Sequence, residues 1–168
     1  MPNSTVVAIF ITDKSAEPMR SVTSIEAVAS RGLQGDRKFR DPSHPKKDTP
    51  DREVTLIESE AIEAVNRDYV LKLDAIETRR NILTRGVALN HLVGREFSVG
   101  PVRMRGLELC EPCKHVEKLT RPGVMRALIH RGGLRAQILE GGTISVGDAI
   151  QNATAETPSR RGKEEKGI

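Results

Sequence analysis

The sequence predicts a mostly β fold with a few short helices, in which an antiparallel or mixed sheet takes a barrel-like shape. Three observations favour this class. Roughly seven short apolar segments follow one another along the chain, separated by turns rich in glycine. Only two or three stretches show the apolar spacing of a helix, so repeated βαβ units are not expected. The length of 168 residues suits a single domain with one core.

The N-terminal part predicts strands, one loop and one helix. Residues 6–12 form a run rich in β-branched side chains and predict the first strand, and residues 22–29 predict the second. Residues 40–52 contain three prolines and many charges, which indicates a loop. Residues 53–58 return to strand character. Beyond Ser59, apolar residues recur every three or four positions, which predicts an amphipathic helix with a serine N-cap.

The remaining elements are shorter. The sequence predicts strands at residues 77–84, 96–100 and 102–109, and short helices at residues 87–93 and 124–130. Residues 110–123 read as irregular. Residues 134–140 and 143–150 predict a closing hairpin with Gly141 and Gly142 as its turn. Apolar content then falls, so we expect one domain over residues 1–150 and a disordered tail over residues 151–168.

Composition argues against several classes of function. Aromatic residues make up 2% of the chain and the net charge is only +4, so neither base stacking nor a dense phosphate-binding surface is expected, and we expect no nucleic-acid partner. No apolar run approaches the roughly 18 residues of a membrane span, so we expect no membrane association. The two cysteines, Cys110 and Cys113, are too close in sequence to staple a fold, which favours a cytoplasmic location.

Residues 77–86, ETRRNILTRG, place fixed positive charge beside apolar residues. In a strand, alternate side chains share a face, so Arg79 and Asn81 would project together if Ile82 faces the core. A guanidinium beside an amide is a good receptor for phosphate, because both groups donate hydrogen bonds and one is charged. The alternative is a solvated strand face on which Arg79 pairs with Glu77.

The segment CEPC, Cys110 to Cys113, allows four interpretations. It could supply half of a zinc site together with His115, although no second pair of ligands follows at the usual spacing. It could be a dithiol redox pair, which requires a helix start in a βαβ context. A single thiolate could carry sulfur or ligate a soft metal. Finally, both cysteines could pack as small apolar side chains.

The segment GLQGDR adds a weaker signal. Gly32 and Gly35 let the backbone turn sharply or approach a ligand, while Asp36 and Arg37 could simply pair with each other. By itself this segment reads as an ordinary turn.

Taken in order, five segments resemble the MOSC family, the molybdenum cofactor sulfurase C-terminal domain, in its small stand-alone bacterial form. They are GLQGDR, REVTLIESEAI, ETRRNILTRGVALNHLVGREFSVG, LELCEPCKHVEKL and RGGLRAQILEGGTISVGDAI. The resemblance implies a β-barrel-like MOSC domain with a pocket for the molybdenum cofactor, a molybdopterin with a terminal phosphate. Family members bind this cofactor, carry sulfur to it, or reduce N-hydroxylated compounds with it. No site for pyridoxal phosphate is seen in this chain.

The resemblance also assigns roles to residues. It implies that Cys113 is the catalytic cysteine and the molybdenum ligand. The expected cofactor-binding residues are Arg79, Arg80, Asn81, Gly32, Gly35, Asp36 and Arg37. Expected partners are a sulfur donor such as a cysteine desulfurase, an electron-donor protein, or a molybdoenzyme. Three alternatives stay open: a non-catalytic cofactor or sulfur carrier, a CxxC dithiol redox protein, and an anion-binding domain with inert cysteines. Whether the chain is an enzyme is left open as well.

Overall fold

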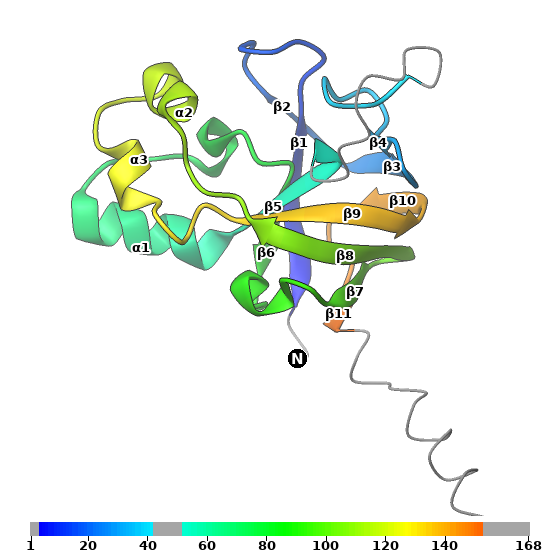
Figure 1. The fold of residues 1–168 in the computed structure, drawn as a ribbon. Helices are drawn as coiled ribbons and strands as arrows, with labels where there is room; N and C mark the ends of the chain where they lie inside the picture. Colours follow the sequence, from blue (N-terminus) through cyan, green and yellow to red (C-terminus); the bar gives the residue numbers. More distant parts are fainter. Residues whose placement is uncertain (1–3, 42–51, 153–168) are drawn as a thin grey trace, which may run out of the picture.

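The computed structural model describes residues 4–41 and 52–152, and its strands form two sheets (Figure 1). The larger sheet has eight strands in the order β11-β7-β8-β9-β5-β6-β1-β2, and the smaller has three in the order β10-β3-β4. The strands of the larger sheet are β1 (Thr5–Ile11), β2 (Arg20–Val22), β5 (Val54–Glu58), β6 (Ile82–Arg85), β7 (Glu96–Val99), β8 (Val102–Leu109), β9 (Leu134–Glu140) and β11 (Ile150–Asn152). Those of the smaller are β3 (Ser24–Val28), β4 (Gly32–Leu33) and β10 (Gly142–Ser145).

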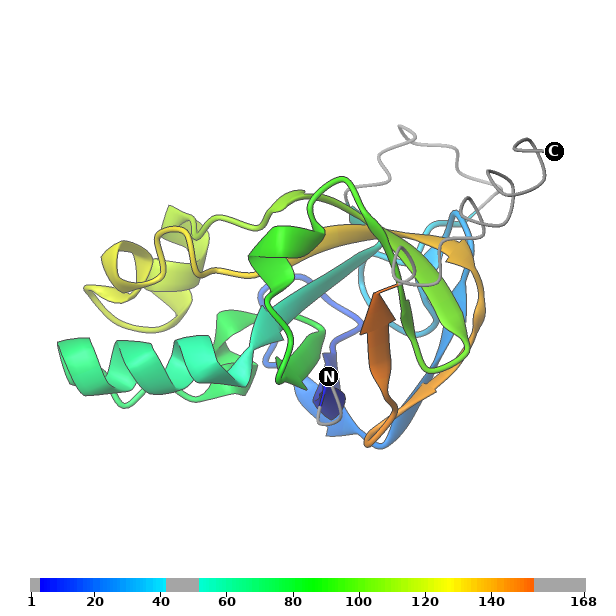
Figure 2. The ribbon, with the colours of Figure 1, turned by 90° about the horizontal axis from the view of Figure 1, so that it is seen from below.

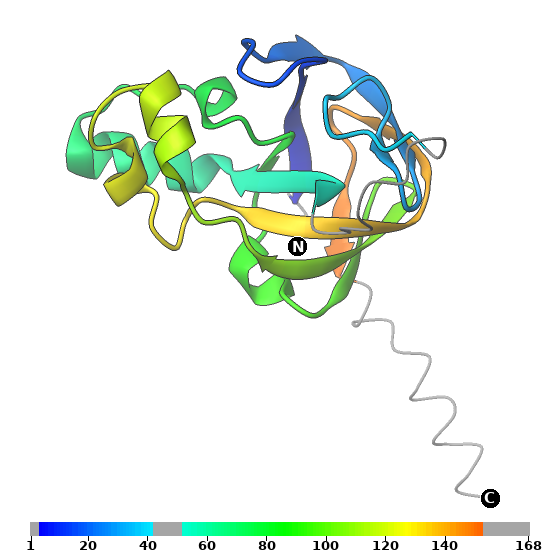
Figure 3. The ribbon, with the colours of Figure 1, turned by 45° about the horizontal axis from the view of Figure 1, so that its top comes forward.

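The helices gather at one end of the larger sheet, away from the three-stranded sheet (Figures 1 and 3). They are α1 (Ser59–Tyr69), α2 (Lys114–Leu119) and α3 (Val124–Ala127), with two 3₁₀ turns, η2 (Ala75–Thr78) and η3 (Leu89–Leu92). None of the helices in the described ranges is long and apolar enough to cross a membrane.

The larger sheet curls so that β11, at one edge, approaches β1 near the other (Figure 2). Three backbone hydrogen bonds join these parts: Val6 N–H to the Asp148 carbonyl at 2.9 Å, Gly147 N–H to the Val6 carbonyl at 2.8 Å, and Ile150 N–H to the Ser4 carbonyl at 2.9 Å. The pairings are antiparallel except for β5 and β6, which run parallel and are joined through α1. The prediction of a mostly β, barrel-like fold is therefore confirmed.

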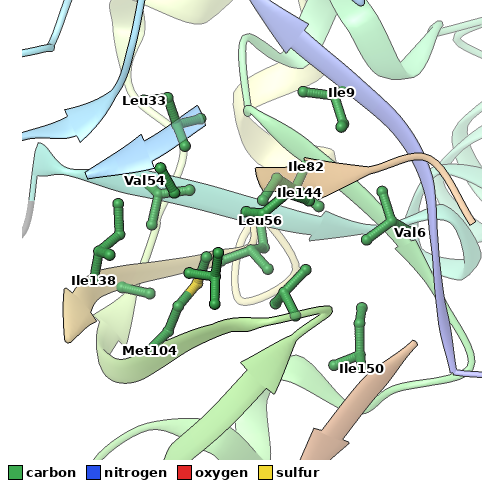
Figure 4. Packing of buried hydrophobic residues seen from close by; sticks show 14 of the residues in the cluster. Val6, Ile9, Leu33, Val54, Leu56, Ile82, Met104, Ile138, Ile144 and Ile150 are labelled. Carbon is green, nitrogen blue, oxygen red and sulfur yellow. The ribbon is translucent and has the colours of Figure 1, made fainter. Parts of the chain in front are cut away.

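Two apolar clusters lie on opposite faces of the central strands. The larger cluster collects residues from both sheets, as Figure 4 shows for part of it. The smaller lies between the other face of the sheet and the helices. Because side chains alternate along a strand, Leu56 and Ile82 enter the larger cluster while Ile57 and Leu83 enter the smaller. The central residues of β5 and the first two of β6 are therefore buried on both faces of the sheet.

The predicted strand over residues 77–84 is wrong in its first half. Only Ile82–Arg85 is a strand, and the residues before it form η2 and a turn. The cause is a capping box: Asp74 accepts from the backbone of Glu77, and the Glu77 carboxylate accepts the Asp74 N–H at 2.9 Å. The turn closes at Arg79, which adopts the left-handed conformation with φ of 65°.

The predicted closing hairpin is also wrong. β9 pairs with β8 and β5, whereas β10 pairs with β3 in the smaller sheet. Gly141 lies where the chain passes from one sheet to the other, and a Cβ there would meet the Ala27 carbonyl oxygen at 2.5 Å. The double glycine therefore allows a close crossing between sheets instead of a tight turn within one.

Smaller differences concern element boundaries. The predicted second strand is divided into β2 and β3, which belong to different sheets. Residues 110–123 contain the short helix α2, and the N-cap of α1 is Glu58 instead of Ser59, without a side-chain hydrogen bond. β11 includes the first two residues of the predicted tail, Gln151 and Asn152. The rest of that tail, and most of the predicted loop over residues 40–52, lie outside the described residues.

Candidate functional site

A cavity of about 250 Å³ lies where four parts of the chain meet: the loop after β4, the turn before β6, the end of β8, and the start of β9. We call it the basic cavity. Its lining residues are Ser15, Arg37, Lys38, Arg52, Arg79, Arg80, Cys110, Glu111, Cys113, His115, Val116 and Arg135. Six of these side chains are arginine or lysine and one is a carboxylate. Since the whole chain carries a net charge of only +4, this concentration of positive charge favours an anionic ligand.

Arg79 presents hydrogen-bonding capacity that the protein does not use. Its side chain is almost buried, with 8% exposed. Nη1 donates to the Glu17 carbonyl at 2.7 Å, but Nη2 has no hydrogen-bond partner among the described residues. Burial lowers the pKa of Arg79, and the nearby charge of Arg37 adds to this effect. A buried, unpaired guanidinium nitrogen is costly, so an anion bound beside Arg79 would relieve both penalties.

Arg80 ties the turn before β6 to the end of β8 and the start of β9. Its Nε donates to the Gly132 carbonyl at 2.7 Å, Nη2 to the Cys110 carbonyl at 3.0 Å, and Nη1 to the Thr78 carbonyl at 3.2 Å. Burial lowers its pKa, although an arginine remains charged in proteins. Arg80 therefore fixes the shape of the basic cavity and contributes positive charge to it.

The loop after β4 is shaped by the buried carboxylate of Asp36. Its Oδ1 accepts the Thr12 N–H at 3.1 Å, and its Oδ2 accepts the Lys38 N–H at 3.3 Å. Arg37 Nη1 lies 3.5 Å from the same carboxylate and 3.3 Å from the Met19 sulfur. These contacts hold Arg37 and Lys38 at the edge of the basic cavity, so Asp36 acts on the site through the loop without lining it.

The surroundings of Lys38 strongly change its acid–base behaviour. Burial, together with the charges of Arg37, Arg135 and Arg80 and against an opposing contribution from Cys110, lowers its pKa from 10.5 to about 8. The ammonium of Lys38 is thus held among like charges in a partly dehydrated place.

The two cysteines have different environments. Cys113 is exposed, lines the basic cavity and is the N-cap residue of α2. Cys110 is 3% exposed; its N–H donates to the Gly133 carbonyl at 2.7 Å and its carbonyl accepts from Arg80. Both are free thiols. Cys113 is therefore the one that a ligand or partner can reach. Within residues 4–41 and 52–152, no three His, Cys, Asp or Glu side chains gather as a metal site.

Four of the predicted site residues meet in the basic cavity, namely Arg37, Arg79, Arg80 and Cys113. The other four do not line it. Gly32 begins β4 and Gly35 lies in the turn after it, with φ of 114° and 92°, where a side chain would be strained, and Asp36 acts through the loop. The reasoning that Arg79 and Asn81 share a strand face is wrong, because residues 77–81 are not a strand.

Asn81 has a structural role in the sheet. Asn81 is buried, with only 2% of the residue exposed. Oδ1 accepts from the N–H and the hydroxyl of Thr55, each at 3.1 Å, and Nδ2 donates to the Phe10 carbonyl at 3.1 Å. The amide therefore ties the start of β6 to β5 and β1, and this position keeps it away from the basic cavity.

Sequence reasoning did not identify Lys38, Arg52 and Arg135 as site residues. Arg135 follows buried Leu134 in β9 and precedes buried Ala136, so alternation alone places it on the opposite face of the strand. What lies opposite that face depends on pairing between distant strands. Lys38 follows Arg37, and the only sequence feature that could have marked it as a site residue is its place in a loop considered as a pocket edge.

Comparison with known proteins agrees with this architecture. Among solved structures, the YUAD protein of Bacillus subtilis has a TM-score of 0.73 at 13% identity, over 88% of this chain and 94% of that one. YiiM of Geobacillus stearothermophilus has a TM-score of 0.66 at 15% identity, over 89% and 74% of the two chains. YiiM of Escherichia coli has a TM-score of 0.63 at 16% identity, over 88% and 69%. These identities establish similarity of fold alone.

Comparison of the sequence itself gives the family. No curated protein matches the chain. A family model does, and it covers β5 to β11, including the arginines before β6 and both cysteines. Because this model, the MOSC domain, matches residues 42–151 of the 168, the chain belongs to the MOSC domain family, which is associated with the molybdenum cofactor.

Proposed function

We propose that the protein binds the molybdenum cofactor in the basic cavity and uses Cys113 either as a ligand of the metal or as a carrier of sulfur. The observation that supports this most directly is the meeting of Cys113 with five arginines and one lysine in a single cavity. The cofactor combines a phosphate with a metal bound by sulfur. The cavity offers guanidinium groups suited to the first and a thiol suited to the second.

The unpaired Nη2 of Arg79 supports the fit between this cavity and the phosphate of the cofactor. Arg80 uses all three of its guanidinium nitrogens on carbonyls, whereas Nη2 of Arg79, a residue of the cavity lining, has no partner among the described residues. Phosphate oxygens would supply the missing acceptor. In this proposal Arg79 and Arg37 hold the phosphate, and Cys113 faces the metal. When bound, the cofactor would supply a redox-active molybdenum atom.

Cys113 can act as a sulfur carrier without any change in the fold. Its thiolate would attack the terminal sulfur of a persulfide R–S–SH, forming a new S–S bond while the donor leaves as the thiolate R–S⁻. The product is a persulfide on Cys113, and no net oxidant is consumed. The exposure of Cys113 would give a donor protein such as a cysteine desulfurase access to it.

The binding proposal is tested by elemental analysis of molybdenum in protein purified from a host that makes the cofactor. Wild type should retain molybdenum, and Arg79→Gln should lose most of it. Arg126→Gln is the matched control, because Arg126 is an exposed arginine on α3 outside the basic cavity. Background metal in wild type, or equal metal in the two variants, would overturn the proposal. Mass spectrometry for an added mass of about 32 Da on Cys113 tests the persulfide separately.

The dithiol alternative draws on the position of Cys113 at the start of α2. It requires Cys110 to take part, although Cys110 is buried. If Cys110→Ser leaves cofactor retention and any reductase or sulfur-transfer activity intact, the dithiol mechanism fails.

A non-catalytic carrier role would instead be favoured by a protein that holds the cofactor, shows no turnover and co-purifies with a molybdoenzyme. Reductase activity toward N-hydroxylated compounds, supported by an external electron-donor protein, would favour an enzyme.

A further inference from the structure

Lys38 differs in kind from the other cations of the basic cavity. The cavity contains five arginines and this one lysine. The guanidinium group keeps its proton in proteins, whereas the lysine ammonium can lose its proton when burial and like charges disfavour it. The positive charge of the cavity thus has a fixed part and one part that pH can remove.

The position of Lys38 is fixed by the protein. Its backbone N–H donates to Asp36, which also accepts the Thr12 N–H, and these bonds hold the backbone of the loop beside the cavity that Lys38 lines. Arg37 precedes it in the same loop. Arg80 faces it from the turn before β6 and is itself held by three carbonyls.

Two carboxylates among the described residues lie near these cations: Asp36, which accepts the Lys38 N–H, and Glu108, which lies 3.5 Å from Arg135. β9 contributes Arg135, the end of β8 contributes Cys110, and Arg52 and Arg79 line the same cavity. The one acid in the lining, Glu111, is exposed and is engaged by His130, whose N–H and Nδ1 each lie 2.8 Å from its carboxylate. Cys113 and His115 complete the titratable groups of the lining.

We propose that Lys38 controls how tightly the basic cavity holds its anion, binding it in the ammonium form and releasing it in the amine form. This inference rests on the anion-binding role given to the cavity above. The pKa of about 8 places the change within reach of mild conditions. By linkage, a bound anion raises the pKa of Lys38, and each unit of that rise corresponds to a tenfold loss of affinity when the proton is removed.

Equilibrium dialysis with radiolabelled sulfate tests this, since the charge of sulfate does not change between about pH 7 and 9.5. A Cys113→Ser/His115→Asn background removes two other titratable side chains of the lining, while Cys110 and Glu111 are the same in every variant compared. In that background we expect sulfate affinity to fall about tenfold or more over this range, because Lys38 loses its charge. With Lys38→Arg added, the affinity should stay constant. With Lys38→Gln, it should be low throughout.

Each other outcome overturns the inference. An affinity that is constant with Lys38 present shows that this residue does not titrate against the anion. An equal fall with Lys38→Arg assigns the effect to another group. No sulfate binding at any pH removes the anion site. Failure here is separable from failure of the proposed function: molybdenum retained by wild type with a flat sulfate profile rejects only the role of Lys38. If sulfate affinity depends on pH as expected but wild type retains no molybdenum, the cavity binds an anion other than the molybdenum cofactor.

Discussion

Replacing Lys38 by methionine should stabilise the ligand-free protein at neutral pH. Methionine keeps the unbranched apolar stem and removes the ammonium, which lies among Arg37, Arg80 and Arg135. The charge is unfavourable in the folded state because burial and these arginines lower the pKa of Lys38 from 10.5 to about 8. Each unit of such a shift corresponds to about 1.4 kcal/mol of stability, so the ceiling is about 3 kcal/mol. Because Lys38 is only partly buried, we expect a gain of about 1–3 kcal/mol.

The direction in which pH changes the stability of wild type follows from the lowered pKa of Lys38. Above about pH 8 the folded protein has released the Lys38 proton, whereas the unfolded chain keeps it up to 10.5. In this window the unfolded state binds more protons, so the stability of wild type rises with pH. The advantage of Lys38→Met is therefore complete below about pH 8 and disappears toward 10.5.

Urea denaturation of both proteins at a series of pH values measures this difference in unfolding free energy. Lys118→Met is the control, because Lys118 is exposed on α2, and we expect little change at any pH. The reasoning is refuted if Lys38→Met is less stable than wild type near neutral pH. A stability difference that does not vary between about pH 7 and 10.5 would refute it equally.

Three further predictions concern single side chains. Gly106→Ala should lower the unfolding free energy by about 3 kcal/mol in urea denaturation, since its Cβ would lie 2.1 Å from the Leu92 carbonyl oxygen; a loss below about 1 kcal/mol would contradict this contact. Asn81→Ala should cost about 2–4 kcal/mol in the same assay, because it leaves buried hydrogen-bonding groups of two strands, β5 and β1, unpaired. In the native protein, iodoacetamide should label Cys113 and spare Cys110, and labelling of both before unfolding, detected by peptide mass spectrometry, would show that Cys110 is accessible.

Local sequence patterns predicted the elements whose burial follows a simple rule. β1 and β5 were predicted within a residue or two because two apolar clusters require apolar side chains on both of their faces. The turn around Arg79 was missed because a capping box between Asp74 and Glu77 outweighs the strand propensity of the residues after it. The crossing at Gly141 was missed because strand pairing is decided by distant partners.

The same distinction applies to the site. Cys113 and Arg79 could be proposed from residue type and order along the chain, and the structure places both in one cavity. Arg135 and Lys38 could not, because β9 and the loop after β4 come together only when the sheet is assembled. Asn81 is the opposite case. Its amide could bind a ligand, but in the fold it is hydrogen-bonded to β5 and β1.

Arg80 imposes a limit on how this protein can change. Its guanidinium donates to the carbonyls of Thr78, Cys110 and Gly132, and so ties the turn before β6 to the end of β8 and the start of β9. Any substitution that removes its charge also leaves three carbonyls without a donor. Selection for a less anionic or a neutral ligand would therefore have to act on other positions, of which Lys38 and Arg37 are the most permissive. The positive charge that Arg80 gives the cavity is in this way tied to the integrity of the backbone.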